Sequence, residues 1–287
     1  MGAVYKKELF SYYHGLLGWL FAAFVLFFAG IYTMAINLSA QYASFEYVLA
    51  NMSFLFLIAV PVLTMRCIAE ERRQKTDQLL YALPLGMTRI VLGKYFALLT
   101  VMAVPTAVIA VYPLILSRYG AVSLAASYST LLAFFLLGAA LLALGMFLSS
   151  LTENQAVSAA ACFVILLILY FIGPLSYYVP STANASLLAF TALLLLLSLV
   201  FDTLTKNSLA AVLLFAVLEA VLVALRVLVP DLLAGSFPAV MNRLSVFDVF
   251  TGFAGGLFDL GSVVYYLSII GVLLFLTVQS MEKRRWI

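Results

Sequence analysis

The chain alternates long apolar runs with short polar breaks, and the runs are long enough to cross a membrane. A membrane-spanning helix needs about 20 consecutive apolar residues, and charge-free runs of this kind recur along the whole sequence. The pattern predicts an all-α, polytopic membrane helix bundle that forms a single transmembrane domain over residues 1–287. The eight predicted spans are 16–36, 52–68, 95–116, 129–148, 156–172, 187–201, 208–229 and 263–278.

Composition excludes most other classes of protein. Of the 287 residues, 66% are hydrophobic and 9% are charged, whereas soluble domains are about 45–50% apolar and about 25% charged. A soluble globule, a disordered chain and a coiled coil are therefore excluded. The net charge of +3 is too small to indicate nucleic-acid binding. Cys67 and Cys162 both lie inside apolar runs, which favours buried thiols over a disulfide.

The distribution of Lys and Arg predicts the orientation. Cytoplasmic loops of membrane proteins carry an excess of these residues. With eight spans and both termini in the cytosol, twelve of the fifteen basic residues face the cytosol, and only Arg118, Arg226 and Arg243 lie on the outer side. A six-span alternative, in which 187–229 is a hairpin that dips in from outside, keeps both termini on the same side.

One polar block, between the second and third spans, predicts a short helix on the membrane surface. Thr76 can cap a helix, and Leu79, Leu80 and Leu83 follow at helical spacing on one face. Pro84 then ends the helix. The alternative is an ordinary charged loop that anchors two spans.

The same block carries a family resemblance. The run Glu70-Glu71-Arg72-Arg73, the stretch from Thr76-Asp77 to Pro84, and Gly93-Lys94 at the next span resemble the first cytosolic loop of ABC type-2 exporter permeases. That family usually has Gly where this chain has Lys75, and Glu where it has Asp77. Residues 149–155 resemble its second cytosolic turn. Residues 247–250, 255–260 and 264–268 resemble the gliding-motility-type branch, whereas 187–229 matches neither and is read as an added helix pair.

The resemblance implies a role for each segment. Residues 5–14 would be an interfacial elbow helix, 70–85 a cytosolic coupling helix that docks on a separate ABC ATPase subunit, and 231–260 an outer re-entrant segment. A second permease copy or a paralogue would complete the transporter in a bacterial inner membrane, surrounded by lipid, with ATP and Mg on the ATPase subunit. The implied ATPase-coupling residues are Glu70, Glu71, Arg72, Arg73, Thr76, Asp77, Leu79, Leu80, Leu83 and Pro84.

The residues themselves indicate no enzyme and no cofactor on this chain. A P-loop requires G-x-x-x-x-G-K-[ST], and the nearest match, Gly93-Lys94-Tyr95, fails at Tyr95 and at Thr88. No catalytic triad or metal motif is present, and His14 has no ligand at the required spacing. An ion-coupled secondary transporter and a non-transporting membrane assembly subunit remain as alternative functions.

Two charges lie inside a predicted span. Glu219 and Arg226 are seven residues apart, so they share one helix face about 10 Å apart. Charges inside a membrane are costly and indicate a functional site. The alternative is that Arg226 reaches the outer surface and Glu219 bonds to a neighbouring helix.

Overall fold

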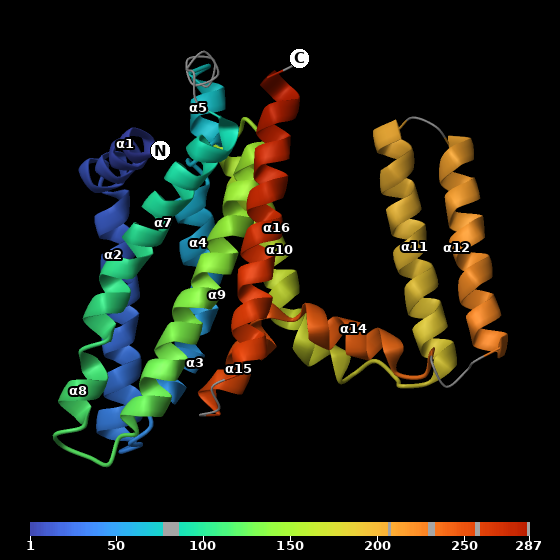
Figure 1. The fold of residues 1–287 in the computed structure, drawn as a ribbon. Helices are drawn as coiled ribbons and strands as arrows, with labels where there is room; N and C mark the ends of the chain where they lie inside the picture. The colour runs from blue at the N-terminus through green and yellow to red at the C-terminus, as the bar shows by residue number, and fades with distance from the viewer. Residues whose placement is uncertain (77–85, 206–207, 229–232, 256–258, 286–287) are drawn as a thin grey trace. The chain divides into compact units, whose positions relative to one another are not determined.

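The computed structural model describes residues 1–76, 86–205, 208–228, 233–255 and 259–285, and within these ranges it contains helices and no strands (Figure 1). The helices are α1 Gly2–His14, α2 Leu17–Thr33, the π-helix Met34–Ser39, α3 Glu46–Met52, the 3₁₀ turn Ser53–Leu55, α4 Phe56–Thr64, α5 Ala69–Arg73, α7 Met87–Ile109, α8 Tyr112–Leu116, α9 Leu124–Leu151, α10 Gln155–Ser176, α11 Ala183–Thr205, α12 Ser208–Leu228, α14 Ser236–Leu244, α15 Val246–Ala254 and α16 Leu260–Arg285.

The prediction of an all-α polytopic membrane bundle is confirmed. In the described part of the chain, seven helical segments are long and apolar enough to cross a membrane, and they are Leu17–Ser39, Glu46–Arg73, Met87–Leu116, Leu124–Leu151, Gln155–Ser176, Ser208–Leu228 and Leu260–Arg284. The remaining predicted span, 187–201, corresponds to α11, whose apolar part Ala183–Leu199 is shorter.

The chain forms two compact units. The first comprises Met1–Ile168 and Phe247–Ile287, and the second comprises Leu169–Val246. Helix α10 begins in the first unit and ends in the second.

Helix α9 lies at the centre of the first unit, where it packs against α4, α7 and α16. Two glycines allow this close approach. A Cβ added at Gly138 would lie 2.5 Å from Met102 Sδ, and one added at Gly145 would lie 2.3 Å from Thr64 Oγ1. Small residues at helix contacts are typical of membrane bundles, because they let two backbones approach.

Backbone breaks shape the helices at both edges of this unit. Leu16 has a φ of 64° between α1 and α2, which lets the chain turn sharply there. The predicted third span is interrupted after Ile109, and α8 begins three residues later with Pro113 in its first turn. Proline is favoured at that position because it needs no hydrogen-bond acceptor for a backbone N–H.

Both termini lie at the same end of the first unit, together with α1 and α5 (Figure 1). This end also carries the charged residues around α5 and the last turn of α16. It is called the polar end below.

The second unit contains α11 and α12, which run antiparallel side by side, and α14, which packs against α11. Ser176 Oγ is hydrogen-bonded to Asn242 Oδ1 and joins the end of α10 to α14.

Candidate functional site

The polar end contains a buried lysine. Lys94 lies in the second turn of α7, and its side chain is completely buried. Its Nζ donates hydrogen bonds to Glu8 Oε1 and to the carbonyl oxygen of Cys67, both at 2.9 Å. The same Nζ lies 2.9 Å from Glu71 Oε2, in an ion pair without hydrogen-bond alignment. One ammonium group therefore joins α1, α5 and the turn that follows α4.

A second lysine balances the charge. Lys7 Nζ lies 3.3 Å from Glu71 Oε1 and 3.9 Å from Glu8 Oε1, and it is largely exposed. Lys7, Glu8, Glu71 and Lys94 are called the lysine–glutamate cluster below. Two carboxylates and two ammonium groups leave the cluster with no net charge, which lowers the free energy cost of burying it.

Helix α1 turns one face toward this cluster. Val4, Glu8 and Tyr12 are its buried residues, and their spacing of four places them on a single face. The Tyr12 hydroxyl donates to the carbonyl oxygen of Leu63 at 3.3 Å. Burial, followed by the charges of neighbouring groups, raises the pKa of Tyr12 well above its usual value, so its hydroxyl remains a donor. Gly93 lies on the facing side of α7, where a Cβ would come within 3.2 Å of Val4.

The beginning of α5 is joined to the end of α9. The Ser149 hydroxyl accepts hydrogen bonds from the backbone N–H groups of Ile68 (3.2 Å) and Ala69 (3.0 Å). Arg72 Nη1 donates to the carbonyl oxygen of Ser150. A cation at the last carbonyl groups of a helix is favoured by the helix dipole, so these contacts satisfy the ends of both helices.

Helix α16 joins the same region. The Ser280 hydroxyl donates to the carbonyl oxygen of Ser150 at 3.2 Å, and Arg284 Nη1 lies 2.9 Å from Glu153 Oε1. The polar end therefore ties together α1, α5, α7, α9 and α16.

The structure divides the residues that sequence analysis assigned to ATPase coupling. Glu71 and Arg72 are engaged inside the bundle, as described above, and Glu70 Oε2 lies 2.9 Å from Arg66 Nε. Arg73 is exposed, and the Thr76 hydroxyl donates to the carbonyl oxygen of Glu71. Helix α5 ends at Arg73 and a turn follows over residues 74–76. Asp77, Leu79, Leu80, Leu83 and Pro84 lie outside the described residues, and the coupling role of the segment stays a prediction.

Sequence reasoning missed the partners of the cluster. The sequence analysis used Lys94 only as part of the Gly93-Lys94 motif, and it assigned no role to Lys7 or Glu8. The available signal was Lys94 itself, a charge one turn inside an apolar run, because such a charge needs a partner. The sequence does not reveal that the partner is Glu8, which lies 86 residues earlier.

Lys75, next to this region, has a strained backbone. Its φ is 56°, a left-handed conformation that costs a residue with a side chain about 1–2 kcal/mol and that glycine adopts freely. We expect Lys75→Gly to raise the free energy of unfolding by about 0.5 kcal/mol, because the greater freedom of glycine in the unfolded chain offsets part of the gain. Thermal unfolding of the purified protein in detergent measures this change. Lys75→Ala is the control, since it removes the charge but keeps Cβ. An equal gain with alanine would contradict the backbone explanation.

The two charges of α12, Glu219 and Arg226, have separate partners on α11. The Thr191 hydroxyl oxygen lies 2.9 Å from Glu219 Oε1, and Arg226 Nε donates to Asn184 Oδ1 at 2.8 Å. Glu219 therefore does bond to a neighbouring helix, as one of the two interpretations expected. A functional role of either residue stays a prediction.

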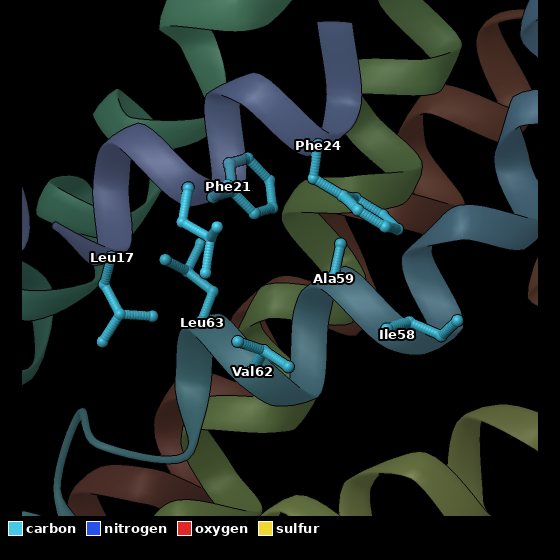
Figure 2. A pocket seen from close by; sticks show the side chains of 8 residues that line it. Leu17, Phe21, Phe24, Ile58, Ala59, Val62 and Leu63 are labelled. Carbon is cyan, nitrogen blue, oxygen red and sulfur yellow. The ribbon is translucent and has the colours of Figure 1, made fainter. Parts of the chain in front are cut away.

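An apolar groove lies between α2 and α4 in the first unit (Figure 2). It has a volume of about 170 Å³ and is lined by Leu17, Leu20, Phe21, Phe24, Ile58, Ala59, Val62 and Leu63. All its lining residues are apolar, so it suits hydrocarbon chains. In the described part of the chain, no group of three or more His, Cys, Asp or Glu side chains could hold a metal ion.

Comparison with models of protein families gives a match. A family model described as ABC-2 family transporter protein matches residues 29–187, which is more than half of the chain. The matched region runs from α2 to the beginning of α11 and includes α5, Lys94 and the end of α9. No curated protein matches the chain.

Proposed function

The chain belongs to the ABC-2 family of transporter proteins, and from this premise we propose that it is the membrane-spanning permease subunit of an ATP-driven exporter, with ATP hydrolysed on a separate subunit. The observation that carries the proposal is the way in which the described beginning of segment 70–85, residues 70–76, is held. Glu71, at its beginning, and Lys94, two turns into the helix that follows it, meet in the lysine–glutamate cluster. A partner that pushes on this segment therefore pushes on a firmly tied polar end.

The cluster supports a rigid-body mechanism. Its contacts join α5 to α1 and α7, while Arg72 and Ser149 join α5 to α9. A displacement of the coupling segment is then shared among helices rather than absorbed by one loop. ATP binding closes the pair of ATPase subunits, and the coupled helices tilt toward an outward-open state. Such coupling requires that the segment bind the ATPase differently in the two states.

The polar end is proposed to face the cytosol, where the ATPase subunits are. The excess of Lys and Arg in the predicted cytosolic segments supports this orientation. The outer side then holds α15 (Val246–Ala254), since the Thr130 hydroxyl near the beginning of α9 donates to the carbonyl oxygen of Phe253. Thr130 and Ser150 are about 30 Å apart along α9 at 1.5 Å per residue.

The remaining assignments follow from the resemblance. Helix α1 is proposed as the interfacial elbow helix, and 231–260 as an outer re-entrant segment near the exit of the path. The motifs in 247–268 support the gliding-motility-type branch. A second permease copy or paralogue and two ATPase subunits complete the exporter, in the inner membrane of a bacterial cell, with ATP and Mg on the ATPase.

The test of this function is a double substitution in the coupling segment. Leu79→Ala with Leu80→Ala removes two predicted apolar anchors. Truncating one interface anchor commonly costs about 2 kcal/mol or more, which corresponds to a roughly 30-fold loss of affinity. We expect the ATPase subunit to dissociate, or to stay bound with its hydrolysis uncoupled from transport. Co-purification and substrate-stimulated ATP hydrolysis measure the two outcomes.

Leu114→Ala with Leu124→Ala is the matched control. Both leucines are exposed, and they lie on α8 and at the beginning of α9, away from the polar end. This variant should keep the ATPase and its coupling. If the Leu79 and Leu80 variant also retains both properties, segment 70–85 is not the coupling element and the exporter proposal loses its main support.

A further inference from the structure

The antiparallel pair α11–α12 is held by two polar contacts in the same register. Thr191 faces Glu219, and Asn184 faces Arg226. Each contact lies seven residues, or two helical turns, from the other along both helices. Because both contacts repeat at the same spacing, Glu219 is positioned by the packing of α12 against α11 and not by a local loop.

The Thr191 hydroxyl has two oxygen atoms as neighbours, one on Leu187 and one on Glu219. The Thr191 Oγ1 atom is 2.9 Å from the carbonyl oxygen of Leu187 and also 2.9 Å from Glu219 Oε1. A hydroxyl group has one proton, and a carbonyl oxygen can only accept. If Thr191 donates to Leu187, as threonine commonly does within a helix, the contact with Glu219 is a hydrogen bond only when Glu219 supplies the proton.

Among the residues that the structure describes, Glu219 has no ion-pair partner. The charged groups on the helices packed here are Asp202 on α11, Arg226 on α12 and Arg243 on α14, and none forms an ion pair with Glu219 in the described structure. The other carboxyl oxygen, Oε2, is buried and has no hydrogen-bond partner among the described residues. Helix α12 is otherwise apolar around this residue, and its length fits a membrane span. An unpaired carboxylate is costly in such a place.

We propose that Glu219 is a proton-binding site inside the membrane: it is held as the neutral acid and donates its proton to Thr191, which in turn donates to the carbonyl oxygen of Leu187. The site joins α12 to α11 without a counter-ion. The carbonyl-type oxygen Oε2 then remains as an acceptor for one further hydrogen bond. This inference rests on the membrane location of the pair and not on the exporter mechanism.

The chain offers a comparison at Glu46. The Ser127 hydroxyl oxygen lies 2.9 Å from both Glu46 Oε1 and the carbonyl oxygen of Ser123. Glu46, however, lies in the first turn of α3, a position at which the helix dipole favours an anion. It therefore provides a control carboxyl with similar hydroxyl geometry and a different electrostatic environment.

Infrared spectroscopy of the full-length protein in lipid vesicles at neutral pH tests the proposal. We expect an un-ionised carboxyl C=O stretch that is lost in Glu219→Gln and persists in Glu46→Gln. In Thr191→Val the band should remain but move, because the acid has lost its acceptor. If Glu219→Gln loses a carboxylate band and keeps every un-ionised carboxyl band, the proposal is overturned.

Chemical labelling of the unmodified chain gives a second readout that does not depend on a variant folding. A hydrophobic carbodiimide added to the vesicles modifies carboxyl groups that carry a proton. Mass spectrometry should find the adduct at Glu219 and not at Glu153, which is exposed and paired with Arg284. No adduct at Glu219 under conditions that label other membrane-embedded acids would contradict the proposal.

Discussion

Lys94→Met is expected to lower the free energy of unfolding of the first unit by about 3–5 kcal/mol, the usual cost of removing one partner from a buried ion pair. The substitution keeps an apolar stem of similar length and removes the ammonium group. Glu8 Oε1 and the carbonyl oxygen of Cys67 then lose their donor, and Glu71 loses its buried counter-ion. Lys7 is too exposed to replace it. A lower yield of folded protein and a lower unfolding temperature in detergent measure the effect.

Two further variants make this result specific. Arg89→Met removes an exposed cation from the same helix and should change stability by no more than a few tenths of a kcal/mol, as surface substitutions usually do. Adding Glu8→Gln and Glu71→Gln to Lys94→Met should recover part of the loss, because no buried charge is then left unpaired. A Lys94→Met protein as stable as the parent would show that the cluster does not hold the polar end together.

Gly145→Leu is expected to destabilise the same unit by about 3 kcal/mol, near the upper end of what overpacking costs. The first added carbon atom would lie 2.3 Å from Thr64 Oγ1 and 2.8 Å from Thr64 Cβ. Thr64 is branched at Cβ and its hydroxyl donates to the carbonyl oxygen of Val60, so it has little freedom to move. Helices α4 and α9 must therefore separate. Thermal unfolding in detergent measures the loss.

Gly30→Leu is the matched control for this prediction. Gly30 lies in α2, and a Cβ there would meet nothing within 4 Å. The variant should be close to neutral or slightly stabilising, because leucine is a better helix former than glycine. If Gly30→Leu and Gly145→Leu lower the free energy of unfolding equally, the loss is caused by leucine in general and not by the contact with Thr64.

The helices could be predicted from the sequence because membrane spans are encoded locally. Each span requires only a run of apolar residues of sufficient length, and the predicted segments 16–36, 129–148 and 263–278 fall within or overlap the observed helices. Pro61 and Pro105 lie inside α4 and α7, and the break before Pro113 occurs where helix formation is least favourable.

The polar contacts could not be predicted because they depend on how distant helices pack. Glu8 meets Lys94 only after α1 lies against α7, and Arg72 meets the carbonyl oxygen of Ser150 only after α5 lies against α9. Glu219 and Arg226 could be placed on one helix, seven residues apart, from the sequence alone. Their partners, Thr191 and Asn184, follow only when the register of α11 against α12 is known.

The lysine–glutamate cluster also sets the order in which the protein can be assembled during synthesis. The two carboxylates, Glu8 and Glu71, leave the ribosome before Lys94 does, and the other cation of the cluster is the exposed Lys7. Until α7 is made, both groups have to remain in water or at the lipid headgroups, because burying them alone is too costly. The N-terminal helix therefore stays at the membrane surface until the third later span has been made, when Lys94 allows α1 to dock.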